Sequence, residues 1–541
     1  MRRLLMCLAI LGLGGDAPAE PATGAVTKER PNILLIVADD LGYSDLGCYG
    51  AEVIMTPNLN RLATEGLRFT QFYSAGRGCP TRAALLTGLY AHQTGVGHTT
   101  IDFGLAGYRG NLNRQCATIA QLLGAAGYQT AMVGKWHLTR HVGRQGPDHT
   151  WPRQRGFDDF YGTLLGAGSY FDPVTLMREN EFVGQIENAD FYYTEAIGEQ
   201  AAAMLDRAKD IAAPFFLYVA FTAPHWPLHA RKNILDSYAG RFYMGWDELR
   251  AKRHQRMIDM GIVHRYWKLA PRDRRVLPWT EAPLRAWHQR RMEAYAAQVD
   301  SMDRAVGAIL EKVNQIGRAE STLVMFLSDN GAGAEEILAD WRGLHIPKKT
   351  TRGLAVSAGN DPQTMPGGEE TYQSYGVPWA NVSNTPFRLY KSYCHEGGIA
   401  VPLIVRWPEV IQPSLATGDL TREIGHAIDI MATCCDVAGV AYPSIHAGYR
   451  IKPLEGVSLL PAFLGKELPM RPIFFEHEGN RAIRYGRWKL VATAGGSWEL
   501  YDMNADRTEN FNRAEREPGV VGKMASLYDE WAARVGVAPW Q

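Results

Sequence analysis

Two pairs of adjacent oxygen-bearing side chains stand out in the sequence. Asp39 and Asp40 end the apolar stretch PNILLIVADD, and Asp329 and Asn330 follow the apolar run in STLVMFLSDNG. Ligands that are all oxygen select a hard cation such as Ca²⁺ or Mg²⁺ over zinc. Either pair alone is a weak signal, because Asp-Asp after a strand and SDNG are also typical of turns and caps.

Cationic and imidazole side chains occupy similar positions elsewhere. Lys135 and His137 end YQTAMVGKWH, His225 lies in FFLYVAFTAPHW, and Arg82 lies in CPTRAALLTG. Facing a bound cation, they would form a pocket for a small tetrahedral oxyanion, in which positive charge neutralises the anion and a histidine protonates the leaving oxygen. A single histidine at a strand end is more often structural, so the prediction depends on the combination.

The elements that must position these residues follow one plan: a β-rich apolar run, then polar residues with Gly or Pro. Runs that are apolar on both faces indicate strands of a sheet covered by helices. Between them, stretches such as residues 293–313 carry apolar residues at helical spacing. The alternation predicts a three-layer α/β/α fold with a large, mostly parallel sheet. Ligands of such folds bind beyond the carboxyl ends of the strands, so the polar residues should converge there.

Together the stretches resemble the type I sulfatase family of the alkaline phosphatase superfamily. PNILLIVADDLGYSDLGCYG is similar to the family's opening metal motif, CPTRAALLTG to its signature helix, and GKWHL to its lysine-histidine motif. APHWPLHA, LSDNGA and NTPFRLYKSYCHEGGIAVPLIVRWP resemble its second histidine, second metal and late lysine motifs. The resemblance covers nearly the whole mature chain, is nearest to bacterial arylsulfatase-like members, and implies an alkaline-phosphatase-like α/β domain with a small C-terminal α+β domain.

The resemblance also implies a role for each matched residue. Arg82 and Lys135 would steady the catalytic residue, and His137 would assist breakdown of its sulfated form. Lys391 and His225 would hold the sulfate, and His225 would protonate the departing alcohol or phenol. The implied calcium ligands are the oxygen donors named above together with the catalytic residue: Asp39, Asp40, Gly78, Asp329 and Asn330.

The catalytic position itself departs from the family pattern. The family uses formylglycine, made from Cys or Ser in Cys-x-Pro-x-Arg, whose hydrate attacks sulfur. Counting back from Pro80, that position is Gly78, which has no β-carbon to oxidise. A shift of register to Cys79 is disfavoured, since Pro80 restricts the backbone of Cys79.

Three explanations for Gly78 stay open. The residue is formylglycine, or another aldehyde-bearing residue, written as glycine; or it is a true replacement, natural or engineered, that leaves binding of sulfate esters but poor turnover; or it is an error in the sequence. A formylglycine-generating or sulfatase-maturating enzyme is an expected partner if the gene encodes cysteine at position 78.

The leading interpretation is therefore a calcium-dependent sulfatase that releases sulfate from an aryl or carbohydrate sulfate, with a small molecule or glycan as substrate. One alternative is a catalytically impaired protein that binds sulfated ligands. Another is a phosphate or phosphonate ester hydrolase on the same scaffold. Related phosphohydrolases commonly use two metal ions, whereas Lys and His stand where the second metal's ligands would be, which favours sulfate.

Composition excludes some other classes. Lys and Arg number 57, as do Asp and Glu, so the net charge is zero and no global field draws the chain to nucleic acid or an acidic membrane. Residues 228–289 are rich in Arg, Lys and Trp, but Asp and Glu are mixed in, as on solvated helix faces. The 7 cysteines are scattered, unlike a disulfide scaffold. Cys434 and Cys435 are expected to pack in a helix.

The ends of the chain suggest its organisation. MRRLLMCLAILGLGGDAPAE has the pattern of a signal peptide over residues 1–19, cleaved after Ala19 and followed by a linker over 20–30. No later stretch reaches the roughly 18 apolar residues of a membrane span, so we expect a periplasmic or secreted protein. The catalytic domain is predicted over 31–465. The small domain is predicted over 466–541, with an antiparallel sheet and a helix over 520–535.

Overall fold

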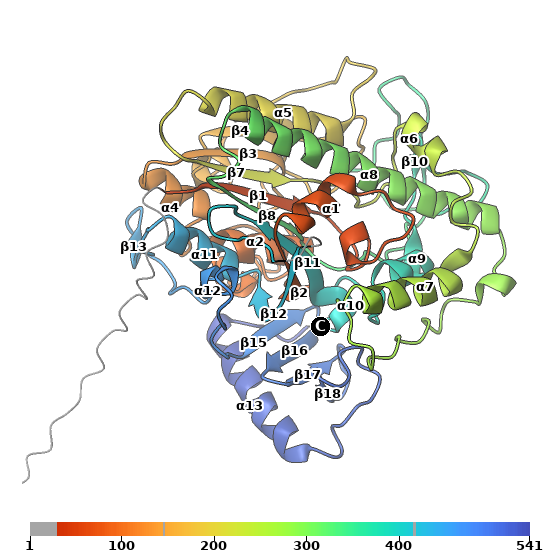
Figure 1. Cartoon of the computed structure of the whole chain (residues 1–541). Coiled ribbons are helices and arrows are strands. Elements are labelled where there is room, and N and C mark those ends of the chain that lie inside the picture. The colour runs from red at the N-terminus through yellow and green to blue at the C-terminus, as the bar shows by residue number, and fades with distance from the viewer. Residues whose placement is uncertain (1–29, 144–145, 415–417, 541) are drawn as a thin grey trace, which may run out of the picture.

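The computed structural model describes residues 30–143, 146–414 and 418–540 (Figure 1). A ten-stranded sheet of order β12-β2-β11-β8-β1-β7-β3-β4-β5-β6 runs through the molecule. Its strands are β1 (Asn32–Ala38), β2 (Leu67–Tyr73), β3 (Gln129–Lys135), β4 (Asp159–Thr163), β5 (Leu176–Arg178), β6 (Glu181–Phe182), β7 (Phe215–Ala220), β8 (Thr322–Ser328), β11 (Ala400–Arg406) and β12 (Asp419–His426). The predicted signal peptide and all but the last residue of the predicted linker lie outside the described residues.

The four apolar runs that predict strands form the centre of this sheet. β1 pairs in parallel with β7 and β8, and β7 pairs in parallel with β3. Their carboxyl ends therefore share one edge of the sheet. Antiparallel pairing enters at β11, which lies between β8 and β2, and at β5 and β6. The prediction of a large, mostly parallel sheet is confirmed.

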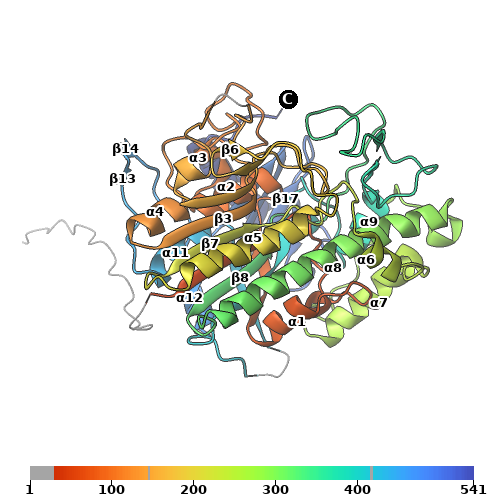
Figure 2. The same cartoon turned by 90° about the horizontal axis from the view of Figure 1, so that it is seen from above.

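Helices cover both faces, so the three-layer prediction is confirmed as well (Figures 1 and 2). Successive residues of β1 alternate between two apolar cores: Leu34 and Ile36 enter one, and Ile33 and Leu35 the other. The first core lies under α1 (Pro57–Thr64), α5 (Tyr193–Ala208) and α8 (Arg285–Gln315), and the second under α2 (Gly78–Thr87), α4 (Ile119–Ala125) and α11 (Asp429–Val437). The helix predicted over 293–313 lies within α8, and Cys434 and Cys435 are buried in α11.

Shorter elements complete the main domain. The segment rich in Arg and Trp carries α6 (Lys232–Ser237) and α7 (Gly245–Asp259). The others are α3 (Ala91–Thr94), β9 (Ser357–Ala358), β10 (Thr371–Tyr372), α9 (Gly376–Ser383), α10 (Glu396–Ile399), β13 (Ile445–His446), β14 (Tyr449–Arg450) and α12 (Leu460–Phe463), with single 3₁₀ turns at Gly47–Tyr49, Arg153–Arg155 and Trp279–Glu281. None of the described helices combines the length and apolar character needed to cross a bilayer.

The C-terminal part is a separate four-stranded antiparallel sheet with one long helix, at the bottom of Figure 1. It consists of β15 (Ile473–His477), β16 (Asn480–Tyr485), β17 (Trp488–Ala492), β18 (Glu499–Asp502) and α13 (Pro518–Val535). Tyr528 and Trp531 of α13 pack on one face of this sheet, and Phe475 on its other face joins the core of the main domain. The predicted boundary after residue 465 stays a prediction.

Candidate active site

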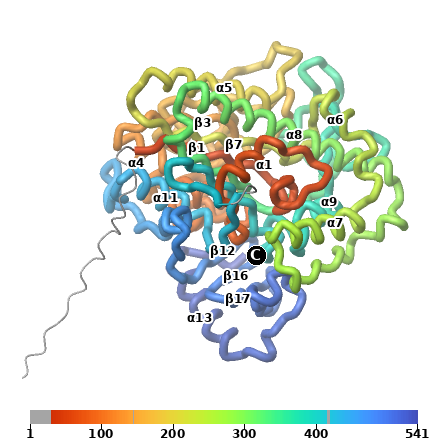
Figure 3. Tube along the Cα trace, viewed as in Figure 1, coloured from red at the N-terminus to blue at the C-terminus, as the bar shows by residue number. Residues whose placement is uncertain are grey.

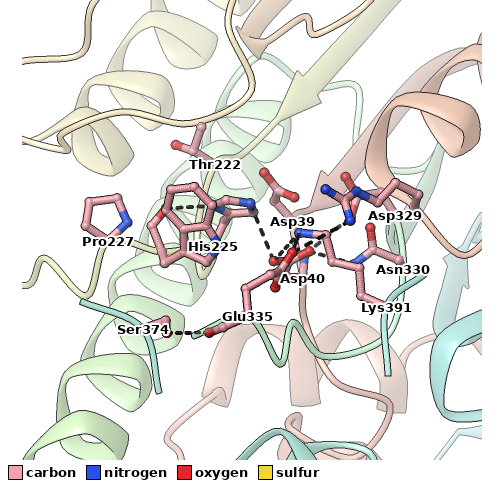
Figure 4. Close-up of polar contacts among 12 residues, drawn as sticks. Asp39, Asp40, Thr222, His225, Pro227, Asp329, Asn330, Glu335, Ser374 and Lys391 are labelled. Atoms are coloured by element: carbon pink, nitrogen blue, oxygen red, sulfur yellow. Dashed lines mark hydrogen bonds and ion pairs between the residues drawn. The ribbon is translucent and has the colours of Figure 1, made fainter. Parts of the chain in front are cut away.

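Three carboxylates and one amide side chain meet at the shared edge of β1 and β8 (Figure 4). Ala38 pairs with Ser328, so Asp39 and Asp329 leave the sheet side by side. The backbone N–H of Asp40 donates to Oδ1 of Asp329 at 3.2 Å, and Nδ2 of Asn330 donates to Oδ1 of Asp40 at 2.6 Å. All four residues are buried.

This cluster fits a hard cation. Oδ1 of Asn330 is buried and has no hydrogen-bond partner among the residues that the structure describes. Burial and the neighbouring Asp39 carboxylate raise the pKa of Asp329 to about 6. An unpartnered amide oxygen beside crowded carboxylates is what a bound cation would satisfy, and oxygen donors are the ligands of Ca²⁺ and Mg²⁺.

Residue 78 faces the same oxygen atoms from the start of α2. A β-carbon built on Gly78 would lie 2.9 Å from Oδ2 of Asp329 and 3.8 Å from Oδ1 of Asn330. The φ of Gly78 is outside the left-handed region, so the backbone itself does not require glycine. Cys79 instead packs in the apolar core beneath α2, where burial raises the pKa of its thiol to about 11. The position predicted for the nucleophile is therefore residue 78, and no side chain occupies it.

Arg82 and Lys135 lie between this position and the sheet. Arg82, one helical turn after residue 78, donates from Nε to Oδ2 of Asp329 at 2.9 Å, and its Nη2 lies 3.9 Å from Oδ2 of Asp39. Lys135 ends β3 and pairs through Nζ with Oδ2 of Asp39. Both cations are buried, so each is fixed by the carboxylate that it neutralises.

Lys391 and His225 also contact the cluster, both at Asp40 (Figure 4). Nζ of Lys391 lies 2.8 Å from Oδ2 of Asp40, and Nε2 of His225 lies 3.6 Å from the same oxygen. Burial alone would raise the pKa of Asp40, but the charges of Lys391 and His225 outweigh burial and hold that pKa well below its usual range. Nδ1 of His225 donates to the Trp226 carbonyl at 2.6 Å, which leaves Nε2 facing the cluster.

His137 belongs to the same neighbourhood. It lies two residues beyond β3 with a φ of 53°, and its ring fills the space above Gly166, where a β-carbon would be 2.0 Å from Cε1. Burial, helped by the charges of Lys135 and Arg82, holds the pKa of His137 well below its ordinary value. All residues predicted for the site are thus brought to one end of the sheet.

Sequence reasoning missed two residues. Oε1 of Glu335 lies 2.8 Å from Nζ of Lys391, and Oε2 is buried without a hydrogen-bond partner in the described chain. Arg77, next to residue 78, lies 3.9 Å from Glu335. Glu335 comes six residues after Asp329 in a stretch with no periodicity, so only its closeness to a metal motif could have drawn attention to it.

Two protein-family models match this chain. The family model "Sulfatase" matches residues 31–440, and the model "N-sulphoglucosamine sulphohydrolase, C-terminal" matches residues 387–527. The second match begins inside the segment predicted as the catalytic domain.

Individual relatives match over nearly their whole length. An uncharacterized sulfatase of Schizosaccharomyces pombe is 33% identical, over 94% of this chain and 95% of the relative. The arylsulfatase of Klebsiella aerogenes is 32% identical, over 80% of this chain and 92% of the relative. The crystal structure of Ps i-CgsB in complex with k-i-k-neocarrahexaose has the same fold, with a TM-score of 0.66 and 24% identity over 93% of both chains.

Proposed function

The chain belongs to the sulfatase family of sulfuric ester hydrolases, and we propose that it hydrolyses an aryl or carbohydrate sulfate ester to an alcohol or phenol and inorganic sulfate. The observation that carries this proposal is the convergence of Asp39, Asp329 and the cations around the β-carbon position of residue 78.

The charge balance of the pocket favours an anionic substrate when a cation is bound. Ion pairs among the described residues join four carboxylates to four cationic side chains: Asp39, Asp40, Asp329 and Glu335 to Arg77, Arg82, Lys135 and Lys391. These charges balance, and a divalent cation would give the pocket the net positive charge that attracts a sulfate ester. The metal should therefore strengthen sulfate binding.

Two groups, a Ca²⁺ ion and formylglycine at position 78, would supply chemistry that the ordinary side chains lack. Asp39, Asp40, Asp329 and Asn330, with the residue at position 78, would hold one Ca²⁺, which supplies positive charge for the sulfate oxygens. We propose formylglycine at position 78, whose hydrate supplies a nucleophilic hydroxyl.

The side chains of the pocket orient the ester and move its protons. Arg82 and Lys135 fix the carboxylates beside position 78, so the group there is held in one orientation. Lys391 can transfer its ammonium hydrogen bonds from Asp40 and Glu335 to the sulfate oxygens. His225, whose Nδ1 is used by the Trp226 carbonyl, turns Nε2 toward the pocket and is placed to carry a proton to the departing oxygen. His137 would assist the breakdown of the sulfated form of residue 78.

The test joins two measurements on purified protein. Release of sulfate from a chromogenic aryl sulfate is followed with Ca²⁺ and after chelation, and the tryptic peptide of residues 78–82 is weighed by mass spectrometry. The expected result is an aldehyde or its hydrate at position 78 with calcium-dependent turnover. A higher rate on the matched phosphate ester would replace the proposal with phosphate ester hydrolysis.

Glycine at position 78 favours one second candidate, a protein that binds sulfated ligands without turnover. It predicts saturable binding of a sulfated sugar in Ca²⁺ with an unmodified peptide and no product. Absence of binding to sulfated ligands would exclude this form.

Two further proposals concern the localisation of the protein and its maturation. We propose that it is exported to the periplasm or secreted, because its first residues have the pattern of a cleavable signal. If the gene encodes cysteine at position 78, a formylglycine-generating or sulfatase-maturating enzyme is its partner.

A further inference from the structure

A second group of metal-ligand side chains lies where the main domain meets the C-terminal sheet. His98 belongs to the loop after α3, and His477 and Glu478 lie at the end of β15. Nε2 of His98 is 2.9 Å from Oε1 of Glu478, and Nε2 of His477 is 3.5 Å from the same oxygen. One donor atom from each residue lies within 4.8 Å of the other two. They share no residue with the first site, and Arg77, whose charge interacts with both Glu335 and Glu478, lies close to both groups.

The one polar neighbour of the His477 ring among the ion pairs of the described chain is Glu478, at 3.5 Å from Nε2. The side chain of His477 is fully buried, and neither ring nitrogen makes a hydrogen bond within the described part of the chain. A buried polar group without a partner costs about 1–3 kcal/mol, so such groups call for an explanation.

Glu478 is held in an unusual place as well. His477 pairs with Asn480, so Glu478 and Gly479 are the two central residues of the β15–β16 turn, with φ values of 51° and 76°. Such turns favour Asn, Asp or Gly at the first central position. Turn geometry therefore does not account for glutamate here. Its side chain is 30% exposed, which leaves the group open to solvent on one side.

The surroundings orient the two imidazoles. Their rings stack with centroids 5.1 Å apart and an angle of 7°, and Trp540 stacks on the outer face of His98 at 4.9 Å. Nδ1 of His98 is 3.1 Å from Oγ1 of Thr99, an outer contact that directs Nε2 toward Glu478.

We propose that His98, His477 and Glu478 bind a divalent transition metal of the zinc class, with the fourth position open to solvent or to an anionic ligand. Two imidazoles and one carboxylate are a ligand set of such metals, in contrast to the oxygen donors of the first site. Zinc–ligand bonds of 2.0–2.2 Å separate tetrahedral ligands by about 3.3 Å, close to the 2.9 and 3.5 Å between these donors. The metal would connect a loop of the main domain to the C-terminal sheet.

Cobalt absorption tests the site, because Co²⁺ replaces Zn²⁺ and its visible bands report nitrogen ligation. The full chain, stripped of metals and returned to excess Ca²⁺, is titrated with Co²⁺ and then with Zn²⁺. The expected result is one equivalent of Co²⁺ with visible bands that Zn²⁺ removes. The variants are His98→Gln, His477→Gln and Glu478→Gln, with His149→Gln, an imidazole outside the group, as the matched control.

The variants separate this site from the first one. His98→Gln and His477→Gln should lose the bands and at least tenfold in Zn²⁺ affinity, with circular dichroism unchanged, whereas His149→Gln and Asp40→Asn should keep both. If His477→Gln does not fold, Glu478→Gln on the exposed side of the turn should show the same loss of bands and of Zn²⁺ affinity. Bands or affinity that persist in all three variants, or absence of stoichiometric binding by the natural sequence, would overturn the proposal. Neither outcome bears on sulfate ester hydrolysis.

Discussion

At residue 78 the backbone leaves room for a side chain, and the first atoms that this side chain would meet belong to Asp329 and Asn330. The close contact is with the end of a carboxylate side chain, which can shift by a few tenths of an ångström. Substitution at this position should therefore test chemistry with little effect on folding.

Gly78→Cys, produced together with a formylglycine-generating enzyme, should hydrolyse a chromogenic aryl sulfate several orders of magnitude faster than Gly78→Ala. Both variants add a β-carbon, but only the first can carry the nucleophilic hydrate. Initial rates per folded protein, with the modified fraction measured by mass spectrometry, check this. Equal rates for the two variants would mean that residue 78 is not the nucleophile position.

Lys391→Met should weaken binding of inorganic sulfate in Ca²⁺ about tenfold or more, because hydrogen bonds to charged groups are worth about 1.5–3 kcal/mol. Calorimetric titration measures the affinity, and thermal unfolding shows whether the unpaired Asp40 and Glu335 lower stability. Lys232→Met is the matched control, since Lys232 is exposed and pairs only with Asp236 in the described chain. Unchanged sulfate affinity would remove Lys391 from the pocket.

At the scale of elements, a buried histidine joins two loops beside the site. Nδ1 of His229 accepts the backbone N–H of Tyr170 at 3.3 Å, and Nε2 donates to the carbonyl of Thr371 at 2.6 Å. The hydroxyl of Tyr170 in turn donates to the carbonyl oxygens of Thr222 and His225. His229 thus supports the turn that presents His225.

Acid should weaken the hydrogen bonds of His229 between the pKa of the unfolded chain and that of the folded chain. Burial lowers the pKa of His229 from 6.5 to about 4, so between these values the unfolded chain binds a proton that the folded chain excludes. The free energy of unfolding should therefore fall as pH drops through this window, by about 2–3 kcal/mol at pH 4.5 from this residue. Urea unfolding of the natural sequence and of His229→Gln at pH 7 and pH 4.5 checks this. The same loss in both proteins would contradict it.

The elements also show what sequence could predict. The apolar runs before Asp39, Lys135 and Asp329 predicted buried strands, and their common direction brought the polar residues together. The antiparallel direction of β11 leaves no signal in the sequence, because its run AVPLIVR has the same apolar character as the parallel strands. Glu335 was missed for a similar reason, since its contact with Lys391 bridges a long loop and leaves no periodic signal.

At the scale of the whole molecule, a buried ionic network connects the two sheets. Glu396 of α10 accepts from Nζ of Lys489 at 2.9 Å and from Nε of Arg507 at 2.7 Å, and Lys489 also lies 2.8 Å from Glu509. All four side chains are buried. The C-terminal sheet is therefore tied to the main domain by charge as well as by apolar contacts.

Lys489→Met should lower the free energy of unfolding by about 3–5 kcal/mol, because it leaves Glu396 and Glu509 buried with less compensation. Chemical denaturation followed by tryptophan fluorescence measures the change. Lys523→Met, at an exposed position of α13 with no ion pair among the described residues, is the control and should show no measurable change. A small effect of Lys489→Met would mean that the two sheets are held together by their apolar contacts alone.

β1 lies at the centre of the sheet, so its pairing has to wait until later strands have been synthesised (Figure 3). Its strand leaves the ribosome first, yet one of its two partners, β8, ends only at Ser328. At 5–20 residues per second, the delay is roughly 15–60 seconds. Residue 78 is buried once the sheet has closed, so an enzyme that modifies it would have to act before β1 is enclosed.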